Sequence, residues 1–281
     1  MLRIKRHLIF FVVCLLALAL TLSGCGTKPA SSSDTSKPAE KKVVKIGATA
    51  VPHAEILEAI KPKLAEKGID LQIVVFNDYI QPNLATDKGD IDANYFQHIP
   101  YLETFNTEHK LSLVTIAKVH IEPMGIYSKK VKATADFQKG GTVAIPNDPS
   151  NAGRALCVLQ SAGLIKLKDG VGIKGTVQDI VENPKELNVK MIDAAQLPRV
   201  LDDPKVTGAV INTNYALEAG LNPTKDALYV ESKDSPYSNI LVTKKERAED
   251  PVLKTVAQEL NSDYVKKFIE DKYKGAVVPA F

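Results

Sequence analysis

The chain has 281 residues, of which 44% are hydrophobic and 25% charged, and its formal net charge is +3. This composition is that of an ordinary globular protein, which excludes a fully disordered or fibrous chain. Arg3, Lys5 and Arg6 lie at the very start, so the chain beyond them carries no formal net charge and has no electrostatic footprint for nucleic acid.

The N-terminal segment predicts an export signal. The basic start is followed by an apolar run from Leu8 to Leu22, which is short for a membrane-spanning helix. Leu22-Ser23-Gly24-Cys25 then resembles a bacterial lipobox, which implies transfer of a diacylglyceryl group to the Cys25 thiol and cleavage before it. Residues 1–24 are thus expected to be a signal peptide; the alternative is an uncleaved signal anchor. We expect the working protein on the extracytoplasmic face of the cell membrane, tethered by lipid.

The segment after Cys25 is polar and rich in Ser, Thr, Lys and Pro up to residue 42, so we expect residues 25–42 to be the lipidated cysteine and a disordered linker. Cys14 lies in the leader and Cys25 carries the lipid. Cys157 is then the one free thiol, in an apolar run that predicts a buried side chain.

Strand and helix patterns alternate from residue 43 onward. We expect strands at 43–48, 71–76, 91–96 and 111–118, and helices at 54–67, 80–88 and 100–108. Gly68 and Gly89 are placed to end two of these helices, and Pro62 is expected to kink or split the first. Short connections between strands and helices predict a parallel sheet covered by helices.

The same alternation then starts again. We expect strands at 142–145, 187–192, 206–211 and 240–243, and helices at 151–162, 195–201, 215–219 and 251–272, the last broken near its end. The chain therefore predicts two α/β lobes, with the C-terminal helix returning to the first.

One unusual segment surrounds the end of the predicted strand 91–96. Tyr95, Phe96, His98 and Tyr101 are close together in a chain with only 6% aromatic residues. Ligands of α/β proteins bind at the C-terminal ends of strands, so these side chains are candidates for a ligand pocket. The alternative is that they pack the core, and Tyr95 is the best candidate for that.

A second unusual segment precedes the predicted helix 151–162. Asp148 or Ser150 can cap this helix, and Pro149 suits its first position. Arg154 lies near the N-terminus, where the helix dipole disfavours a cation. A bound carboxylate would explain it, because Arg binds carboxylates through two parallel hydrogen bonds. The alternative is a surface arginine paired with a nearby acidic residue.

These segments carry a family resemblance, from about Lys45 to the C-terminus. Together with five others, they are similar to the methionine-binding lipoproteins of ABC importers, the MetQ and NlpA type. The other segments are Phe76-Asn77-Asp78-Tyr79, Val181-Glu182-Asn183-Pro184-Lys185, Gln196-Leu197-Pro198-Arg199, Ala209-Val210-Ile211-Asn212 and Ser235-Pro236-Tyr237-Ser238-Asn239.

The resemblance implies a two-lobed periplasmic-binding-protein fold, type II-like, with a hinge between the lobes. Residues 43–127 and 238–281 would form lobe I, residues 128–237 lobe II, with crossings near 123–128 and 237–239. The ligand carboxylate would meet Arg154, and Asn212 and Asn239 would hold the α-amino and carboxylate groups. An aromatic pocket would hold the side chain, with two weaker further contacts. The pocket residues are Tyr79, Phe96, His98 and Tyr101, and the weaker contacts are Asn151 and Asn214.

The implied function is capture of methionine and its delivery to an ABC permease and ATPase, by a monomer without cofactor or metal. The stereochemistry of the methionine stays open. Another small amino-acid derivative or a methionine-containing dipeptide is the alternative ligand. The chain contains no metalloprotease, serine-hydrolase or phosphate-loop motif, and His120 with Glu122 is too little for a metal site, so an enzyme is disfavoured. An adhesin is the third class, and it would not need an amino-acid pocket.

Overall fold

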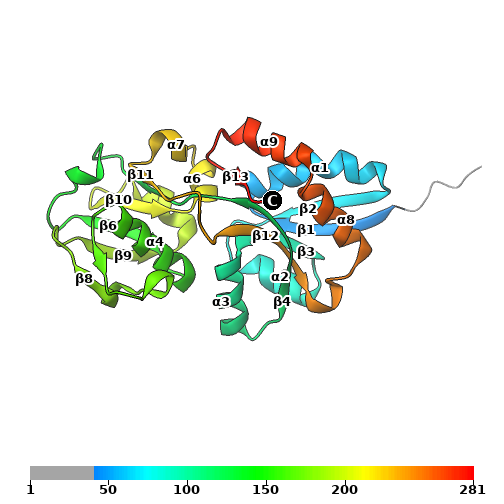
Figure 1. The fold of residues 1–281 in the computed structure, drawn as a ribbon, viewed down its shortest axis with the longest axis horizontal. Helices are drawn as coiled ribbons and strands as arrows, with labels where there is room; N and C mark the ends of the chain where they lie inside the picture. The colour runs from blue at the N-terminus through cyan, green and yellow to red at the C-terminus, as the bar shows by residue number, and fades with distance from the viewer. Residues whose placement is uncertain (1–40) are drawn as a thin grey trace, which may run out of the picture. The chain divides into compact units, whose positions relative to one another are not determined.

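The computed structural model describes residues 41–281, which fall within one unit, Glu40–Phe281. Their strands form two sheets and one small two-stranded ribbon (Figure 1). The predicted signal peptide, Cys25 and nearly all of the predicted linker lie outside the described residues. Among residues 41–281, no helix has the length and apolar character that crossing a membrane requires.

The first sheet has six strands in the spatial order β13-β4-β12-β3-β1-β2. In chain order these are β1 (Lys42–Ala48), β2 (Ile69–Val75), β3 (Ala93–His98), β4 (Leu113–Ile121), β12 (Ser238–Lys244) and β13 (Val278–Pro279). β1 is parallel to β2 and β3, but β12 is antiparallel to β3 and β4. The expected parallel sheet is therefore wrong in part. β12 arrives from the second sheet, at the end where β3 finishes, and so must run in the opposite direction.

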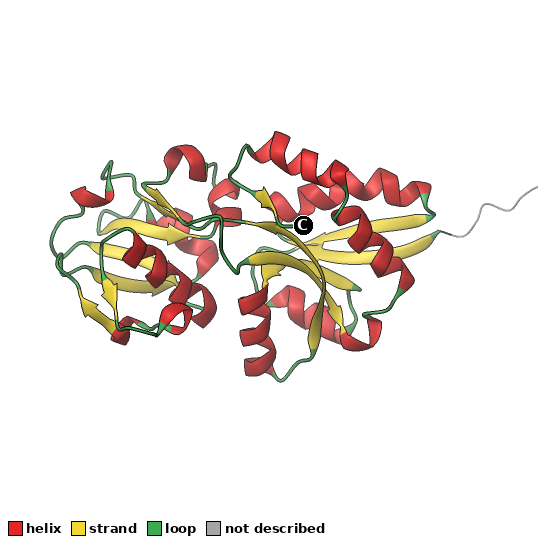
Figure 2. Cartoon of the chain, viewed as in Figure 1, coloured by secondary structure: helices red, strands yellow, loops and turns green. Residues whose placement is uncertain are grey.

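Helices cover both faces of this sheet (Figure 2). On one face α1 (Glu55–Glu66), α8 (Pro251–Leu260) and α9 (Asp263–Tyr273) share a hydrophobic core with β1. On the other face lie α2 (Gln81–Lys88) and α3 (Ile99–His109), which packs on β12. The packing of α8 and α9 against α1 confirms that the C-terminal helices return to the first sheet.

The second sheet has five strands in the order β11-β5-β10-β6-β9. In chain order these are β5 (Gly125–Tyr127), β6 (Thr142–Pro146), β9 (Asn188–Ile192), β10 (Val206–Ile211) and β11 (Tyr229–Val230). β6 is parallel to β9 and β10, whereas β5 is antiparallel to β10 and β11. The chain thus passes from the first sheet to the second between β4 and β5, and returns between β11 and β12.

Helix α4 (Pro149–Ser161) covers one face of the second sheet, while α5 (Leu197–Val200) and α6 (Thr213–Glu218) cover the other. Helix α7 (Pro223–Asp226) follows α6. The ribbon pairs β7 (Lys166–Leu167) with β8 (Ile180–Glu182). Cys157, on α4, is a free thiol. Its side chain is only partly buried, against the hydrophobic core between α4 and the second sheet, and not fully buried as expected.

Several element boundaries differ from expectation. Pro62 lies inside α1 without ending it, because its side of the helix faces solvent and water can satisfy the carbonyl of exposed Glu58. The predicted helix 251–272 is two helices, since Asn261 ends α8 and the Ser262 side chain caps α9. The predicted helix 195–201 is a 3₁₀ turn followed by the single turn of α5. The short strands β5, β7, β8, β11 and β13 were not predicted.

Candidate functional site

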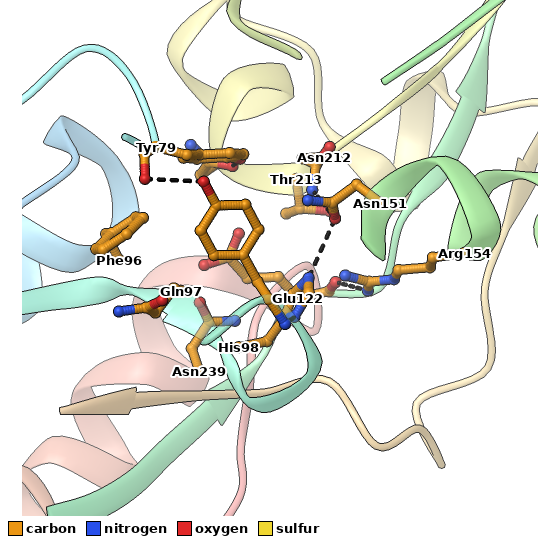
Figure 3. Close-up of a pocket in the computed structure, with 12 residues that line it drawn as sticks. Tyr79, Phe96, Gln97, His98, Glu122, Asn151, Arg154, Asn212, Thr213 and Asn239 are labelled. Carbon is orange, nitrogen blue, oxygen red and sulfur yellow. Dashed lines mark hydrogen bonds between the residues drawn. The ribbon is translucent and has the colours of Figure 1, made fainter. Parts of the chain in front are cut away.

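A cavity of about 330 Å³ lies where residues of the two sheets meet (Figure 3). All nine predicted ligand-binding residues line it, together with three that were not predicted. The predicted ones are Tyr79, Phe96, His98, Tyr101, Asn151, Arg154, Asn212, Asn214 and Asn239, and the others are Gln97, Glu122 and Thr213.

One end of the cavity is aromatic. The ring centroids of Tyr79, Phe96 and Tyr101 are 5.7 to 6.0 Å apart, and the Tyr101 hydroxyl donates to the Tyr79 carbonyl at 2.9 Å. Tyr95, the neighbour of Phe96 on β3, points away into the α1 core and is fully buried there. Strand alternation therefore sends Phe96 to the cavity and Tyr95 to the core, as expected.

His98 ends β3 and caps α3. Its Nδ1 accepts from the Tyr101 backbone N–H at 3.1 Å, so its Nε2 carries the proton and donates to Asn151 Oδ1, also at 3.1 Å. Burial, with the Arg154 charge nearby, lowers the pKa of His98 to about 3. His98 is therefore a neutral hydrogen-bond donor at physiological pH.

Helix α4 begins at Pro149, two residues before the expected start, and of the two candidate caps, Asp148 and Ser150, the structure uses Asp148. The Asp148 carboxylate accepts from the Asn151 backbone N–H at 2.9 Å and from the Asn151 side-chain amide at 3.0 Å. Asn151 Oδ1 accepts from both His98 and Asn212, the latter at 2.8 Å. Asn151 thus has every polar group satisfied, and it links β3 of the first sheet to α4 and α6 of the second.

Arg154 is buried, with only 2% of its surface exposed, and does not lie on the surface. Its Nε and Nη2 donate to the Glu231 carboxylate, at 3.1 Å and 2.6 Å, and Nη2 also donates to the Glu122 carbonyl. The guanidinium lies 3.9 Å above the Tyr237 ring. Within residues 41–281 no group accepts from Nη1, so this guanidinium nitrogen can donate to a ligand in the cavity that Arg154 lines.

Two buried amide atoms at the cavity lack partners within the described residues: Asn212 Oδ1 and Asn214 Nδ2. The opposite end of each amide is engaged, since Asn212 Nδ2 donates to Asn151 and Asn214 Oδ1 accepts from the Tyr79 hydroxyl at 2.6 Å. A buried polar group without a partner costs about 1–3 kcal/mol. A ligand with both a donor and an acceptor would supply hydrogen-bond partners for Asn212 Oδ1 and Asn214 Nδ2.

Glu122 and Asn239 complete the polar end. The side-chain oxygen of Asn239 accepts from His53 Nε2 at 3.0 Å, and Glu122 Oε1 lies 3.2 Å from the same nitrogen and 2.7 Å from His120 Nε2. Burial raises the pKa of Glu122, while His53 and Arg154 oppose that rise. His53, His120 and Glu122 form the one group of three metal-ligating side chains found among residues 41–281.

Sequence reasoning missed Glu122, Gln97 and Glu231. Glu122 was noticed only as a companion of His120, and no local pattern connects it to His53. Gln97 lies between Phe96 and His98 on β3, and strand alternation alone does not predict that three successive residues line one cavity. Glu231 lies far along the chain from Arg154, so only the fold brings the two together.

Comparison with known proteins identifies the family. The model of the NlpA lipoprotein family matches residues 44–281. This chain belongs to that family. The NlpA lipoprotein described here is 43% identical over 270 residues to the D-methionine-binding lipoprotein MetQ of Salmonella typhimurium, covering 96% of each chain.

Solved structures agree with this assignment and with the two-lobed binding-protein fold. A nutrient binding protein from Burkholderia cenocepacia bound to methionine is 45% identical and superposes with a TM-score of 0.81, covering 85% of this chain and all of that one. The methionine binding protein MetQ is 43% identical with a TM-score of 0.83, covering 85% of this NlpA lipoprotein and 98% of that chain.

Proposed function

We propose that this NlpA lipoprotein captures methionine outside the cytoplasm and delivers it to the permease and ATPase of an ABC importer. The observation that carries the proposal is the two-ended cavity, with aromatic rings at one end and unpartnered amide atoms at the other. The names of the relatives support methionine as the ligand. Because those relatives are binding proteins, we assign the cavity a binding role and no reaction.

Each part of methionine has a chemically suited partner. The carboxylate would accept from Arg154 Nη1 and Asn214 Nδ2, and the ammonium would donate to Asn212 Oδ1 and the Glu122 carboxylate. The thioether would lie among the aromatic rings, which interact favourably with sulfur. This assignment makes Glu122 a ligand-binding residue beside those predicted from sequence.

Calorimetric titration of the full-length protein tests the ligand. We expect L-methionine to bind, and D-methionine, methionine sulfoxide and a methionyl dipeptide define how wide the specificity is. Mass spectrometry of the small molecule released on denaturation provides an independent identification. Release of a different small molecule, with no heat from any methionine compound, would refute methionine as the ligand.

We further propose that Cys25 carries the lipid anchor and that residues 1–24 are removed. Cys25→Ser should abolish incorporation of a fatty-acid probe and free much of the protein from the membrane, since acyl chains supply about 0.8 kcal/mol per buried CH₂. Cys157→Ser is the matched control and should keep the label. Label retained on the Cys25→Ser variant contradicts the lipobox assignment.

The lobes proposed here follow the two sheets. Lobe I comprises residues 43 to about 123 with 238–281, and lobe II the residues between. The first boundary is earlier than the expected 127, because β5 pairs with β10 and β11 of the second sheet.

A further inference from the structure

Two fully buried histidines lie behind the cavity without lining it. His53 belongs to the segment Ala50–Ala54 before α1, and His120 to β4. Their ring centroids are 5.0 Å apart. His53 contacts two side chains that line the cavity, Glu122 and Asn239, and His120 contacts Glu122. Asn239 on β12 lies between its register partners His120 on β4 and His98 on β3.

The hydrogen bonds determine which nitrogen of His53 carries the proton. Nε2 faces two acceptors, Asn239 Oδ1 and Glu122 Oε1, and a carboxylate oxygen can only accept from a neutral imidazole. Because Glu122 is assigned as the ionised partner of the ligand ammonium, Nε2 is the N–H. Nδ1 is then the acceptor, for the Thr49 hydroxyl at 2.7 Å.

His120 has the same arrangement. Its Nε2 lies 2.7 Å from Glu122 Oε1 and must donate to it, and its Nδ1 accepts from the Tyr95 hydroxyl. One carboxylate oxygen of Glu122 thus accepts from both imidazoles, which holds that side chain in a single orientation.

These distances are those of hydrogen bonds and not of metal coordination. Two ligand atoms that each lie 2.0–2.1 Å from a tetrahedral zinc ion are about 3.3 Å apart. The separation between His120 Nε2 and Glu122 Oε1 is 2.7 Å, which is too short for that geometry. Both nitrogens of each ring also have a complementary partner in the protein.

We propose that His53 and His120 are positioning residues that determine which atoms Glu122 and Asn239 present to the ligand, an inference that rests on the proposed binding of an amino acid. A flipped Asn239 would place its NH₂ group against the His53 N–H, so its NH₂ group is directed away from His53. Glu122 is held through Oε1, and its carboxylate also has a hydrogen bond from the Asn214 backbone. The acceptor capacity that remains is available to the cavity that Glu122 lines. The two histidines therefore specify one donor and one acceptor for the amino-acid head group.

The test compares His53→Leu with His53→Gln in the full-length protein. Leu removes the N–H, whereas the Gln amide can place an N–H near the position of Nε2. The ligands are L-methionine, 4-(methylthio)butanoate, which lacks the ammonium, and methioninamide, which lacks the carboxylate. We expect His53→Leu to weaken methionine binding about 10- to 100-fold. It should weaken 4-(methylthio)butanoate and methioninamide less, because each analogue keeps only one of the two groups that Glu122 and Asn239 would contact. His53→Gln should stay within about threefold of the wild type.

Exposed His109→Gln is the matched control and should behave as the wild type. Equal losses for all three ligands in His53→Leu, or no rescue by Gln, would show a merely structural role and overturn the proposal. The corresponding pair at His120 provides a second test if His53→Leu does not fold. A wild-type protein that binds none of the three compounds instead overturns the proposed function, and the positioning role with it.

Nitrogen-15 NMR of the imidazole rings gives a readout that needs no ligand. We expect both rings neutral at pH 7, with the proton on Nε2 and a bare Nδ1. A bare Nε2 on His53, or a stoichiometric metal ion in elemental analysis of the purified protein, contradicts the assignment.

Discussion

At the scale of single residues, Arg154 shows how one side chain can serve both structure and ligand. The sequence left two explanations for Arg154, a bound anion or an ion pair with an acidic residue. The structure contains the ion pair, with Glu231. Glu231 accepts hydrogen bonds from Nε and Nη2 only, so it fixes the orientation of the guanidinium and leaves Nη1 free to donate elsewhere. The ion pair thus orients the guanidinium for a carboxylate ligand, in the way that secondary contacts orient a binding group.

Variants of Arg154 separate these two roles. Arg154→Ala should weaken methionine binding by a factor of about 30 to several thousand, because truncating one partner of a buried charge pair costs about 2–5 kcal/mol. It should also destabilise the protein by leaving Glu231 unpaired. In Arg154→Ala with Glu231→Ala, we expect the melting temperature to recover in part and the affinity not to recover. Titration calorimetry and thermal melts measure both, and unchanged affinity in either variant would remove Arg154 from the site.

At the scale of elements, the start of α4 places its functional side chains. Capping by Asp148 fixes where the helix begins, and Asn151 and Arg154 then lie on one face, three residues apart. At Gly153, between these two residues, there is no room for a side chain, because a Cβ there would lie 2.0 Å from the carbonyl oxygen of Ile173. The 3₁₀ turn Gly172–Lys174 packs directly on the α4 backbone.

Gly153→Ala therefore tests the packing of α4. In an unhindered helix interior this change stabilises by up to about 1 kcal/mol. Here we expect a destabilisation of about 1–3 kcal/mol, because the obstacle is backbone and cannot rotate away. Exposed Ser161→Ala, on the same helix, is the control. Urea unfolding measures both, and a Gly153→Ala variant as stable as the wild type would contradict the close contact.

At the scale of the whole described region, side-chain hydrogen bonds join the two sheets around the cavity. They include Tyr79 to Asn214, His98 to Asn151, and the Tyr215 hydroxyl to the Asn77 carbonyl at 3.3 Å. The described state is thus a closed one. With only two crossings between the sheets, we expect a hinge that opens these contacts and closes them on the ligand.

Ligand-driven closure predicts a coupled change in size and stability. Methionine at a hundredfold above its dissociation constant should stabilise the protein by about 2.7 kcal/mol. It should also make the protein more compact, because a ligand that touches both lobes favours the closed state. Small-angle scattering and thermal melts check this, with aspartate as the comparison ligand. An equal response to aspartate would refute the apolar end of the pocket, and no compaction with methionine would refute the hinge.

The buried histidines predict a loss of stability in acid. Burial lowers the pKa of His53 to about 4, and the pKa values of His98 and His120 to about 3. As the pH falls below about 6.5, the unfolded chain takes up protons that the native state does not. Each of the three groups should then steepen the loss of stability by up to about 1.4 kcal/mol per pH unit. The raised pKa values of Glu122 and Asp148 act in the opposite direction and moderate the loss.

Urea unfolding between pH 7 and pH 4 measures this dependence. The His109→Gln variant, at an exposed position, should reproduce the wild-type profile. An unfolding free energy that is the same at pH 7 and pH 5 would contradict the burial of three neutral imidazoles.

The sequence by itself determined what depends on local order. Glycines ended helices at Gly68 and Gly89, a cap at Asp148 or Ser150 began α4, and alternation separated Phe96 from Tyr95. These features follow from backbone sterics, capping and side-chain periodicity, which act over a few residues. Family resemblance then supplied the cavity residues, and all nine line one pocket.

The tertiary structure alone decided which distant groups meet. The short strands β5, β11 and β13 are strands only because they pair with a neighbouring strand of a sheet, so no local sequence pattern predicts them. Glu231 reaches Arg154, and Asn239 reaches His53, through sheet register and chain crossings. A buried charge or imidazole takes its partner from whatever the fold places within about 3 Å, and that choice sets its protonation and its role.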